Sequence, residues 1–254
     1  SGGTESNHIA ILSLLNRPVK GSILVSSLEH PAIREQAEMM KKCGWQVYKI
    51  PSDENGIITA ESVIKAMKDD TALVSVMAVN NETGSIMPIY EISDALTNHC
   101  EGKRRPKFHV DAVQAAGKIP LDLSYKGIDF ASISAHKIGG PRGIGILYAK
   151  DKFEPFLRGG GQENGLRSGT ENLFGSEAIS LCLEKYFIKK EFRGKGYGTE
   201  GLHLTLEVAR GIIPEDEFYL RVNKDNPASL KVMLKNGGYI KAEDEDKYYG
   251  RIKK

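Results

Sequence analysis

Short β-branched segments alternate with segments of helical periodicity through the first three quarters of the chain. This alternation limits the folds open to the chain more than any other pattern in its sequence. The strand-like segments are almost continuously apolar, which is typical of strands buried on both faces. The expected strands are Ser22–Ser26, Trp45–Ile50, Ala72–Val79, Lys107–Val110, Phe130–Ser134 and Gly145–Tyr148. The expected helices are Glu5–Leu15, Ala32–Lys42, Ala60–Met67 and Ile89–Asn98. This alternation predicts an α/β fold whose mainly parallel sheet binds ligands in the loops at the carboxyl ends of its strands.

The organisation changes in the last third of the chain. A Gly-rich stretch from Gly139 to Thr170 leads into a helical pattern that ends near Tyr186. The elements expected after it are a strand at Tyr186–Lys190, a helix at Thr199–Ala209, a strand at Glu217–Val222, a helix at Pro227–Asn236 and a charged tail. We therefore predict two domains, residues 1–186 and 187–254.

Composition excludes several classes of protein. The 254 residues carry 35 Lys and Arg against 33 Asp and Glu, so the net charge of +2 makes no case for nucleic acid or an anionic membrane as partner. No apolar run approaches the roughly 20 residues that span a bilayer. The three cysteines are far apart and form no CxxC pair, so we expect no metal site, no disulfide framework and a reducing, cytoplasmic location. A start at Ser1 without Met indicates a fragment or a processed chain.

Two segments place polar groups where a phosphate or a heteroaromatic ring could bind. Gly2–Glu5 opens the first helix, where backbone N–H groups and the Thr4 hydroxyl suit a phosphate, although ordinary N-capping explains Thr4 about as well. Asp111 ends a predicted strand, where it either holds a proton on a ring nitrogen or caps the following turn.

A third segment, Ser132–Lys137, ends the next strand with a hydroxyl, an imidazole and an amine. A partly desolvated Lys137 would have a lowered pKa and could form a Schiff base with an aldehyde. The alternative is a lysine that has simply reached the surface where the strand ends.

Taken together, these and further segments resemble the cysteine desulfurases that depend on pyridoxal 5′-phosphate (PLP), within the class V aminotransferase superfamily. The matching segments are GGTESNHIAI, SSLEHPAI, VNNETGSIMPI, FHVDAVQAAGKIPLD, SISAHKIGGPRGIGILY and GGGQENGLRSGTEN. The resemblance covers residues 1–186 and implies a truncated large domain of PLP fold type I. It also implies transfer of sulfur from L-cysteine to a persulfide, for iron–sulfur cluster or thio-cofactor synthesis, with a sulfur-acceptor protein as a possible partner.

The resemblance assigns roles residue by residue. Lys137 would bind PLP as a Schiff base, and Asp111 would keep the pyridine nitrogen protonated so that the ring can act as an electron sink. Gln114 would contact the phenolic oxygen of the ring. His30 would stack on the ring and assist proton transfers. Lys137, His30 and Asp111 are therefore the expected catalytic residues.

The remaining cofactor contacts also follow from the resemblance. The residues expected at the phosphate are Gly3, Thr4, Ser134 and His136. Asn81 would lie near the ring and the substrate carboxylate. Thr170 would reach the phosphate of a partner subunit, which implies a homodimer.

The chain also departs from this family. The family needs a nucleophilic cysteine on a loop well beyond the Arg167–Thr170 segment and a C-terminal arginine for the substrate carboxylate, and neither has a match. Cys182 follows Thr170 by 12 positions in an apolar helical stretch and is predicted to be buried. We therefore expect sulfur transfer to be impaired. Trp45, Leu14 and Met39 are interpreted as core residues.

The last 68 residues carry a second set of motifs. Arg193-Gly-Lys-Gly-Tyr-Gly198 precedes a predicted helix, where its glycines let backbone N–H groups approach a pyrophosphate, although a Gly-rich loop on a basic surface would look the same. With the segments Asn223–Ser229 and Lys235–Tyr239, this loop resembles the C-terminal half of the GNAT acetyltransferases. The residues that would bind acetyl-CoA are Arg193, Gly194, Gly196, Gly198 and Asn226. Met233 stands where many members carry a general-acid tyrosine, which speaks against acetyl transfer.

Three functions follow from these patterns: a PLP-dependent cysteine desulfurase-type protein, an acetyl-CoA-dependent N-acetyltransferase, or a non-catalytic remnant. The join near Phe187 is either a genuine fusion or an artefact of sequence assembly.

Overall fold

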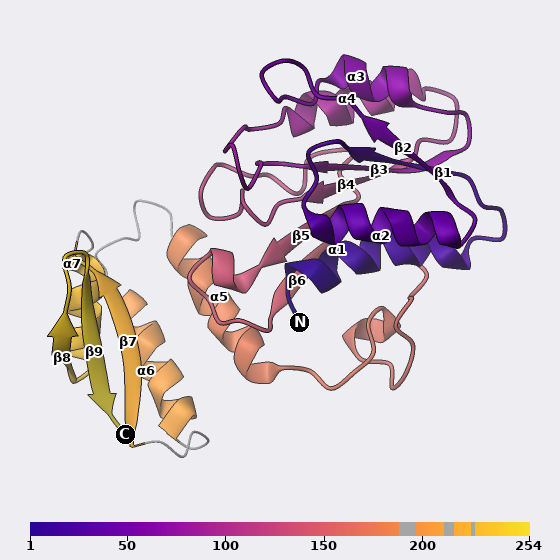
Figure 1. The fold of residues 1–254 in the computed structure, drawn as a ribbon. Helices are drawn as coiled ribbons and strands as arrows, with labels where there is room; N and C mark the ends of the chain where they lie inside the picture. The colour runs from indigo at the N-terminus through magenta and orange to yellow at the C-terminus, as the bar shows by residue number, and fades with distance from the viewer. Residues whose placement is uncertain (188–196, 211–215, 225–226) are drawn as a thin grey trace. The chain divides into compact units, whose positions relative to one another are not determined.

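The computed structural model describes residues 1–187, 197–210, 216–224 and 227–254, and they form two compact units (Figure 1). The first unit comprises residues 1–179 and the second residues 180–254. The division falls within helix α5 (Leu173–Phe187), a few residues before the predicted domain boundary. Each unit is described by itself below.

The first unit is built on a six-stranded sheet of order β2-β1-β3-β4-β5-β6. Its strands are β1 (Ser22–Ser26), β2 (Gln46–Ile50), β3 (Thr71–Met77), β4 (Lys107–Asp111), β5 (Phe130–Ser134) and β6 (Gly145–Ala149). All neighbours pair in parallel except β5 and β6, which are antiparallel. Every residue of β1, β3 and β5 is buried, as the continuous apolar runs predict. The predicted mainly parallel sheet is therefore confirmed.

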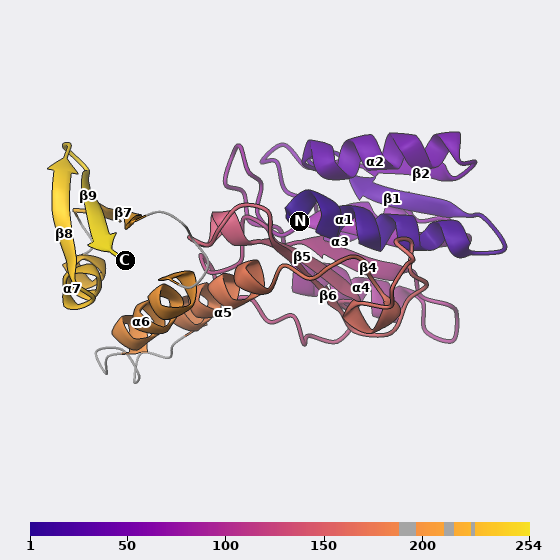
Figure 2. The ribbon, with the colours of Figure 1, turned by 90° about the horizontal axis from the view of Figure 1, so that it is seen from below.

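Helices cover both faces of this sheet (Figure 1). The helix α1 (Gly3–Leu12), which continues as a 3₁₀ turn at Ser13–Asn16, pairs with α2 (Pro31–Lys42) on one face. The helices α3 (Ala60–Ala66) and α4 (Ile89–His99) pair on the other face, and Figure 2 shows the same layers from below. Two further 3₁₀ turns follow, at Ala135–Lys137 and Glu163–Gly165.

Helix α2 shows how local sequence sets the boundaries of an element. Pro31 occupies its first turn, where a missing N–H costs nothing. Lys41 and Lys42 place positive charge in its last turn, where the helix dipole favours it. Gly44, at φ 85°, then takes the left-handed conformation that ends many helices.

One hydrophobic core cluster lies between α1, α2 and the sheet. It contains Ile11, Ile23, Ile33 and Met40, all fully buried, and Trp45 at 3% exposure. The predicted core residue Leu14 is buried, while Met39 is partly buried against the same cluster. Burying each such large apolar side chain contributes about 1.5–3 kcal/mol.

The second unit has an antiparallel sheet of order β7-β9-β8. Its elements are α6 (Tyr197–Arg210), β7 (Glu217–Asn223), α7 (Pro227–Lys235), β8 (Gly238–Glu243) and β9 (Lys247–Lys253). Its small core joins Leu206, Val222, Met233 and Ile252. The helices and β7 confirm the predicted elements of this region.

Two expectations for this part of the chain are wrong. The segment predicted to be a charged tail forms β8 and β9, where Lys241, Glu243 and Lys253 are exposed while Gly250 and Ile252 are buried. The strand predicted at Tyr186–Lys190 is wrong in its first two residues, since Tyr186 and Phe187 end helix α5. The rest of that strand lies outside the described residues.

Candidate functional site

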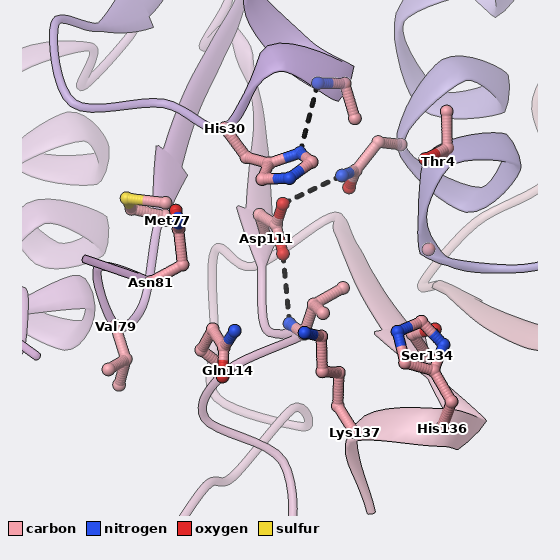
Figure 3. A pocket seen from close by; sticks show the side chains of 14 residues that line it. Thr4, His30, Met77, Val79, Asn81, Asp111, Gln114, Ser134, His136 and Lys137 are labelled. Atoms are coloured by element: carbon pink, nitrogen blue, oxygen red, sulfur yellow. Dashed lines mark hydrogen bonds between the residues drawn. The ribbon is translucent and has the colours of Figure 1, made fainter.

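A pocket of about 270 Å³ opens where the carboxyl ends of β4 and β5 meet the N-terminus of α1 (Figure 3). Nine of the ten site residues predicted in the first unit line it: Gly3, Thr4, His30, Asn81, Asp111, Gln114, Ser134, His136 and Lys137. The tenth, Thr170, is exposed and is not part of this lining. Residues from five separate segments of the chain are thus brought together at the sheet edge where the α/β pattern predicts a ligand.

Asp111 forms the floor of the pocket and is only 5% exposed. Its Oδ2 accepts a hydrogen bond from Asn7 Nδ2 at 2.7 Å, and its Oδ1 accepts from the backbone N–H of Val113 at 2.9 Å. Burial raises the pKa of Asp111, while these two hydrogen bonds and the nearby His30 act in the opposite direction. Asp111 therefore does cap the following turn, and it also presents a buried carboxyl group to the pocket.

The opposite wall is the N-terminus of α1. Helix α1 begins at Gly3 with Gly2 as its N-cap, so the alternative of Thr4 as N-cap is wrong. No side chain caps Gly2, which leaves the first-turn N–H groups without a side-chain acceptor. A Cβ on Gly3 would lie 2.8 Å from Val113 Cγ2 and 3.2 Å from Ser134, so only glycine brings the backbone this close.

Further donors for an anion lie beside this helix end. Ser134 Oγ and His136 Nδ1 are 2.9 Å apart, and both residues line the pocket with Thr4. Glu5, in the same helical turn, is paired with Arg167 Nε at 2.7 Å. That pairing lowers the pKa of Glu5 to about 2 and offsets its negative charge near the helix N-terminus.

His30 lies at the rim of the pocket and is also the N-cap of α2. Its Nδ1 accepts a hydrogen bond from the backbone N–H of Ala32 at 3.1 Å. The neutral imidazole therefore carries its proton on Nε2.

Lys137 ends a 3₁₀ turn directly after β5, and its side chain points into the pocket in Figure 3. The residue is exposed, which favours the second alternative, a lysine at the surface where the strand ends, over a partly desolvated lysine. The reason is local: β5 ends at the buried Ser134, and the turn brings His136 and Lys137 to the protein surface.

The sequence analysis missed two polar residues here. Asn7 lines the pocket and bonds Asp111, and its position one helical turn after Thr4 was an available signal. Glu29, next to His30, is buried at 4% exposure and has no counterpart among the predicted site residues.

These residues fit PLP. The helix start at Gly3, where only glycine fits, lies beside the Ser134 hydroxyl and the His136 imidazole, and together they suit a phosphate. The buried carboxyl group of Asp111 suits a protonated ring nitrogen. The amine of Lys137 lines the same pocket. Among the described residues, no group of three His, Cys, Asp or Glu side chains could hold a metal ion.

The three cysteines and the predicted CoA-binding residues lie outside this pocket or outside the described residues. Cys43 and Cys100 are the C-caps of α2 and α4. Cys182, predicted to be buried, is only partly buried in α5. Of the predicted CoA-binding residues, Arg193, Gly194, Gly196 and Asn226 lie outside the described residues, and Gly198 lies in the first turn of α6.

Comparison with known proteins places the first unit in a family. The family described as aminotransferase class-V matches residues 1–191, about three quarters of the chain. The chain belongs to this class V aminotransferase family. A second match, to the acetyltransferase (GNAT) domain, covers residues 163–238.

The curated relatives are more specific. The chain is 41% identical over 199 residues to a putative cysteine desulfurase IscS 1 of Bacillus subtilis, covering 75% of this chain and 51% of that protein. It is 39% identical over 188 residues to the cysteine desulfurase NifS of Azotobacter vinelandii, covering 73% of this chain and 46% of that protein. The chain thus spans about half the length of the curated relatives it matches.

Solved structures agree with the fold. A NifS-like protein superposes with a TM-score of 0.69 at 29% identity, covering all of this chain and 75% of that one. A structure of SspA in complex with cysteine gives a TM-score of 0.66 at 27% identity, covering 99% and 79%. No helix among the described residues is long and apolar enough to cross a membrane.

Proposed function

We propose that the first unit binds PLP and acts on L-cysteine as a cysteine desulfurase-type protein. The observation that carries the proposal is the pocket in which the buried Asp111, the helix start at Gly3 and the amine of Lys137 meet. The named cysteine desulfurases among the relatives support this chemistry, as does the relative solved with cysteine.

Each end of the pocket would hold one end of the cofactor. The phosphate would bind the N–H groups at Gly3, the hydroxyls of Thr4 and Ser134, and the His136 imidazole. Asp111 would hold a proton on the pyridine nitrogen, and Gln114 and Asn81 would contact the ring substituents. When bound, PLP supplies an electron sink for a carbanion at the amino acid Cα.

The chain's own residues would then handle protons and orientation. Lys137 would link the cofactor and, once displaced by substrate, offer an amine base near Cα. His30 would present Nε2–H to the pocket, because its Nδ1 is occupied by the N–H of Ala32. Asn81, exposed at the rim, would orient the substrate carboxylate.

We further propose that sulfur removal by this polypeptide is impaired. That step needs a thiolate that attacks the substrate sulfur: the S–S bond of a persulfide forms as the Cβ–S bond of the substrate breaks, and the electron pair of the broken bond stays with Cβ, where the electron sink of the bound cofactor would stabilise it. The three cysteines of the chain all lie in described segments, and none of them lines the pocket. A homodimer, in which Thr170 reaches the partner's phosphate, and a cytoplasmic location remain part of the proposal, as does the domain boundary at residues 186 and 187.

A second candidate function is acetyl-CoA binding by residues 187–254, favoured by the GNAT match. Met233 is 1% exposed in the core of that unit and offers no group that could donate a proton. We therefore propose CoA binding without acetyl transfer.

Absorbance and thermal stability separate these functions. PLP binding at Lys137 predicts a visible absorbance band on titration of the purified chain with PLP, and CoA binding predicts a rise in Tm with CoA concentration. A folded chain that shows neither response would contradict both proposals and leave the non-catalytic remnant.

A further inference from the structure

Glu29 is a buried acid to which the proposed chemistry gives no role. It is 4% exposed, and it directly precedes His30 in the turn between β1 and α2. Its Oε1 accepts a hydrogen bond from the backbone N–H of Met77 at 2.8 Å. Its Oε2 is also buried and has no hydrogen-bond partner among the described residues.

The course of the strands explains the first of these contacts. The pairing of β1 with β3 ends at Val25 and Ser75, whereas β3 stays paired with β4 as far as Met77 and Asp111. The N–H of Met77 therefore lies beyond the end of β1, where a buried donor needs another acceptor. Glu29 supplies that acceptor, and this contact anchors the turn that carries His30.

The surroundings of Glu29 favour its neutral form. Burial and the negative charge of Asp111 on β4 raise the pKa of Glu29 well above its usual value. The Met77 N–H on β3 and the Ser26 hydroxyl on β1 act in the opposite direction but more weakly. Asp111 is the one charged group among the described residues that acts on Glu29, so no cation compensates a charge there.

We propose that Glu29 is a positioning residue of the pocket: its carboxyl group accepts the Met77 N–H and so holds His30 at the rim. The positioning role rests on the proposed PLP site. The protonation state of Glu29 does not rest on that site, and it can be measured on the chain without cofactor.

The experiment compares the wild-type 254-residue chain with three variants. Glu29→Gln keeps a neutral acceptor for the Met77 N–H, whereas Glu29→Leu removes it. Glu35→Gln on α2, where the glutamate is exposed, is the matched control for loss of an acid. The Tm of each protein is measured without PLP at several pH values from 5 to 8, and PLP affinity is then measured by visible absorbance at pH 7.5.

The sign of the pH effect follows from proton linkage. An unfolded glutamate ionises near its usual pKa of 4.5, whereas the folded protein keeps the Glu29 proton to higher pH. Between these two values the folded state binds more protons, so this group makes wild-type stability fall as pH rises. Because glutamine carries no ionisable proton, the stability of Glu29→Gln lacks this dependence on pH.

We therefore expect the Tm of Glu29→Gln, relative to wild type, to rise with pH from pH 5 until the pKa of Glu29 in the folded protein is passed, while Glu35→Gln shows no such trend. A Tm difference that stays constant or falls with pH would show that Glu29 is ionised and overturn the protonation assignment. Because glutamine preserves the cap, this test does not depend on the folding of Glu29→Leu.

The affinities test the positioning role. Glu29→Gln should bind PLP as wild type does, and Glu29→Leu should bind about tenfold more weakly or worse. Loss of affinity in Glu29→Gln, or wild-type affinity in Glu29→Leu, would overturn that role. A wild type that takes up no PLP would overturn the proposed function and the positioning role together, while the pH series would still decide the protonation of Glu29.

Discussion

Asn7 on helix α1 donates a hydrogen bond from Nδ2 to Oδ2 of Asp111 at the end of β4, at 2.7 Å and across 104 positions of sequence. Both residues are buried, so the contact fixes the first helix against the strand that carries the floor of the pocket. It joins the two ends of the proposed cofactor site, because the same helix starts at Gly3.

Replacing Asn7 with alanine should lower both stability and PLP affinity. The change leaves Asp111 Oδ2 buried without its partner, which typically costs about 1–3 kcal/mol. Urea unfolding of the cofactor-free chain measures the stability change. Ser6→Ala, which removes a neighbouring hydroxyl bonded only to Gly2 O, is the matched control. Equal stability of the two variants would contradict a structural role for the Asn7–Asp111 contact.

Replacing Asp111 with asparagine should leave the fold nearly unchanged but remove the electron-sink function. The oxygen of the introduced amide could still accept from the Val113 N–H, and the Asn7 amide could rotate because its own Oδ1 has no partner among the described residues. A neutral amide cannot hold a pyridinium proton. We expect slower exchange of the α-proton of a bound amino acid at matched PLP saturation. Exchange at the wild-type rate would exclude the assigned role.

Gly250 in β9 should tolerate no larger residue. A Cβ at this position would lie 2.1 Å from Met233 Sδ, within the core of the second unit. We expect Gly250→Ala to destabilise that unit by about 1–3 kcal/mol, the usual cost of overpacking. Hydrogen exchange of β8 and β9 in the full chain measures this, with the exposed Lys241→Ala as control. Unchanged exchange rates would mean that this core adjusts without cost.

Purified chain should release little or no sulfide from L-cysteine in the presence of dithiothreitol, even with PLP bound. Cys43 and Cys100 cap helices, and Cys182 lies partly buried in α5 outside the lining of the pocket. Turnover that Cys182→Ser abolishes would identify a nucleophile that our account misplaces. Turnover that survives replacement of all three cysteines would contradict the persulfide mechanism for this chain.

Sequence patterns predicted most of the first unit because most of its strands are largely apolar and its motifs follow strand ends. The same logic failed at residues 238–253, where β8 is mostly exposed and only β9 buries alternate residues, Gly250 and Ile252. Motif resemblance pointed to residues that line the pocket. It did not find Asn7 or Glu29, because each acts through another protein group, and such contacts depend on how distant segments pack.

The sequence also did not predict how far the side chains of Lys137 and Cys182 are exposed to solvent. The sequence left open whether Lys137 is partly desolvated or at the surface, and a single 3₁₀ turn after the buried strand is enough to expose it. Cys182 was expected to be buried because its neighbours are apolar, yet its helix leaves it only partly covered.

Attachment of the cofactor at Lys137 is the most direct test of the proposed site. The chain is incubated with PLP, reduced with borohydride, digested and analysed by peptide mass spectrometry, with Lys118 and Lys126 as internal controls on neighbouring segments. Our account predicts a pyridoxyl adduct on Lys137 and an unmodified Lys118 and Lys126. An adduct confined to another lysine, or no adduct on a folded chain saturated with PLP, would contradict it.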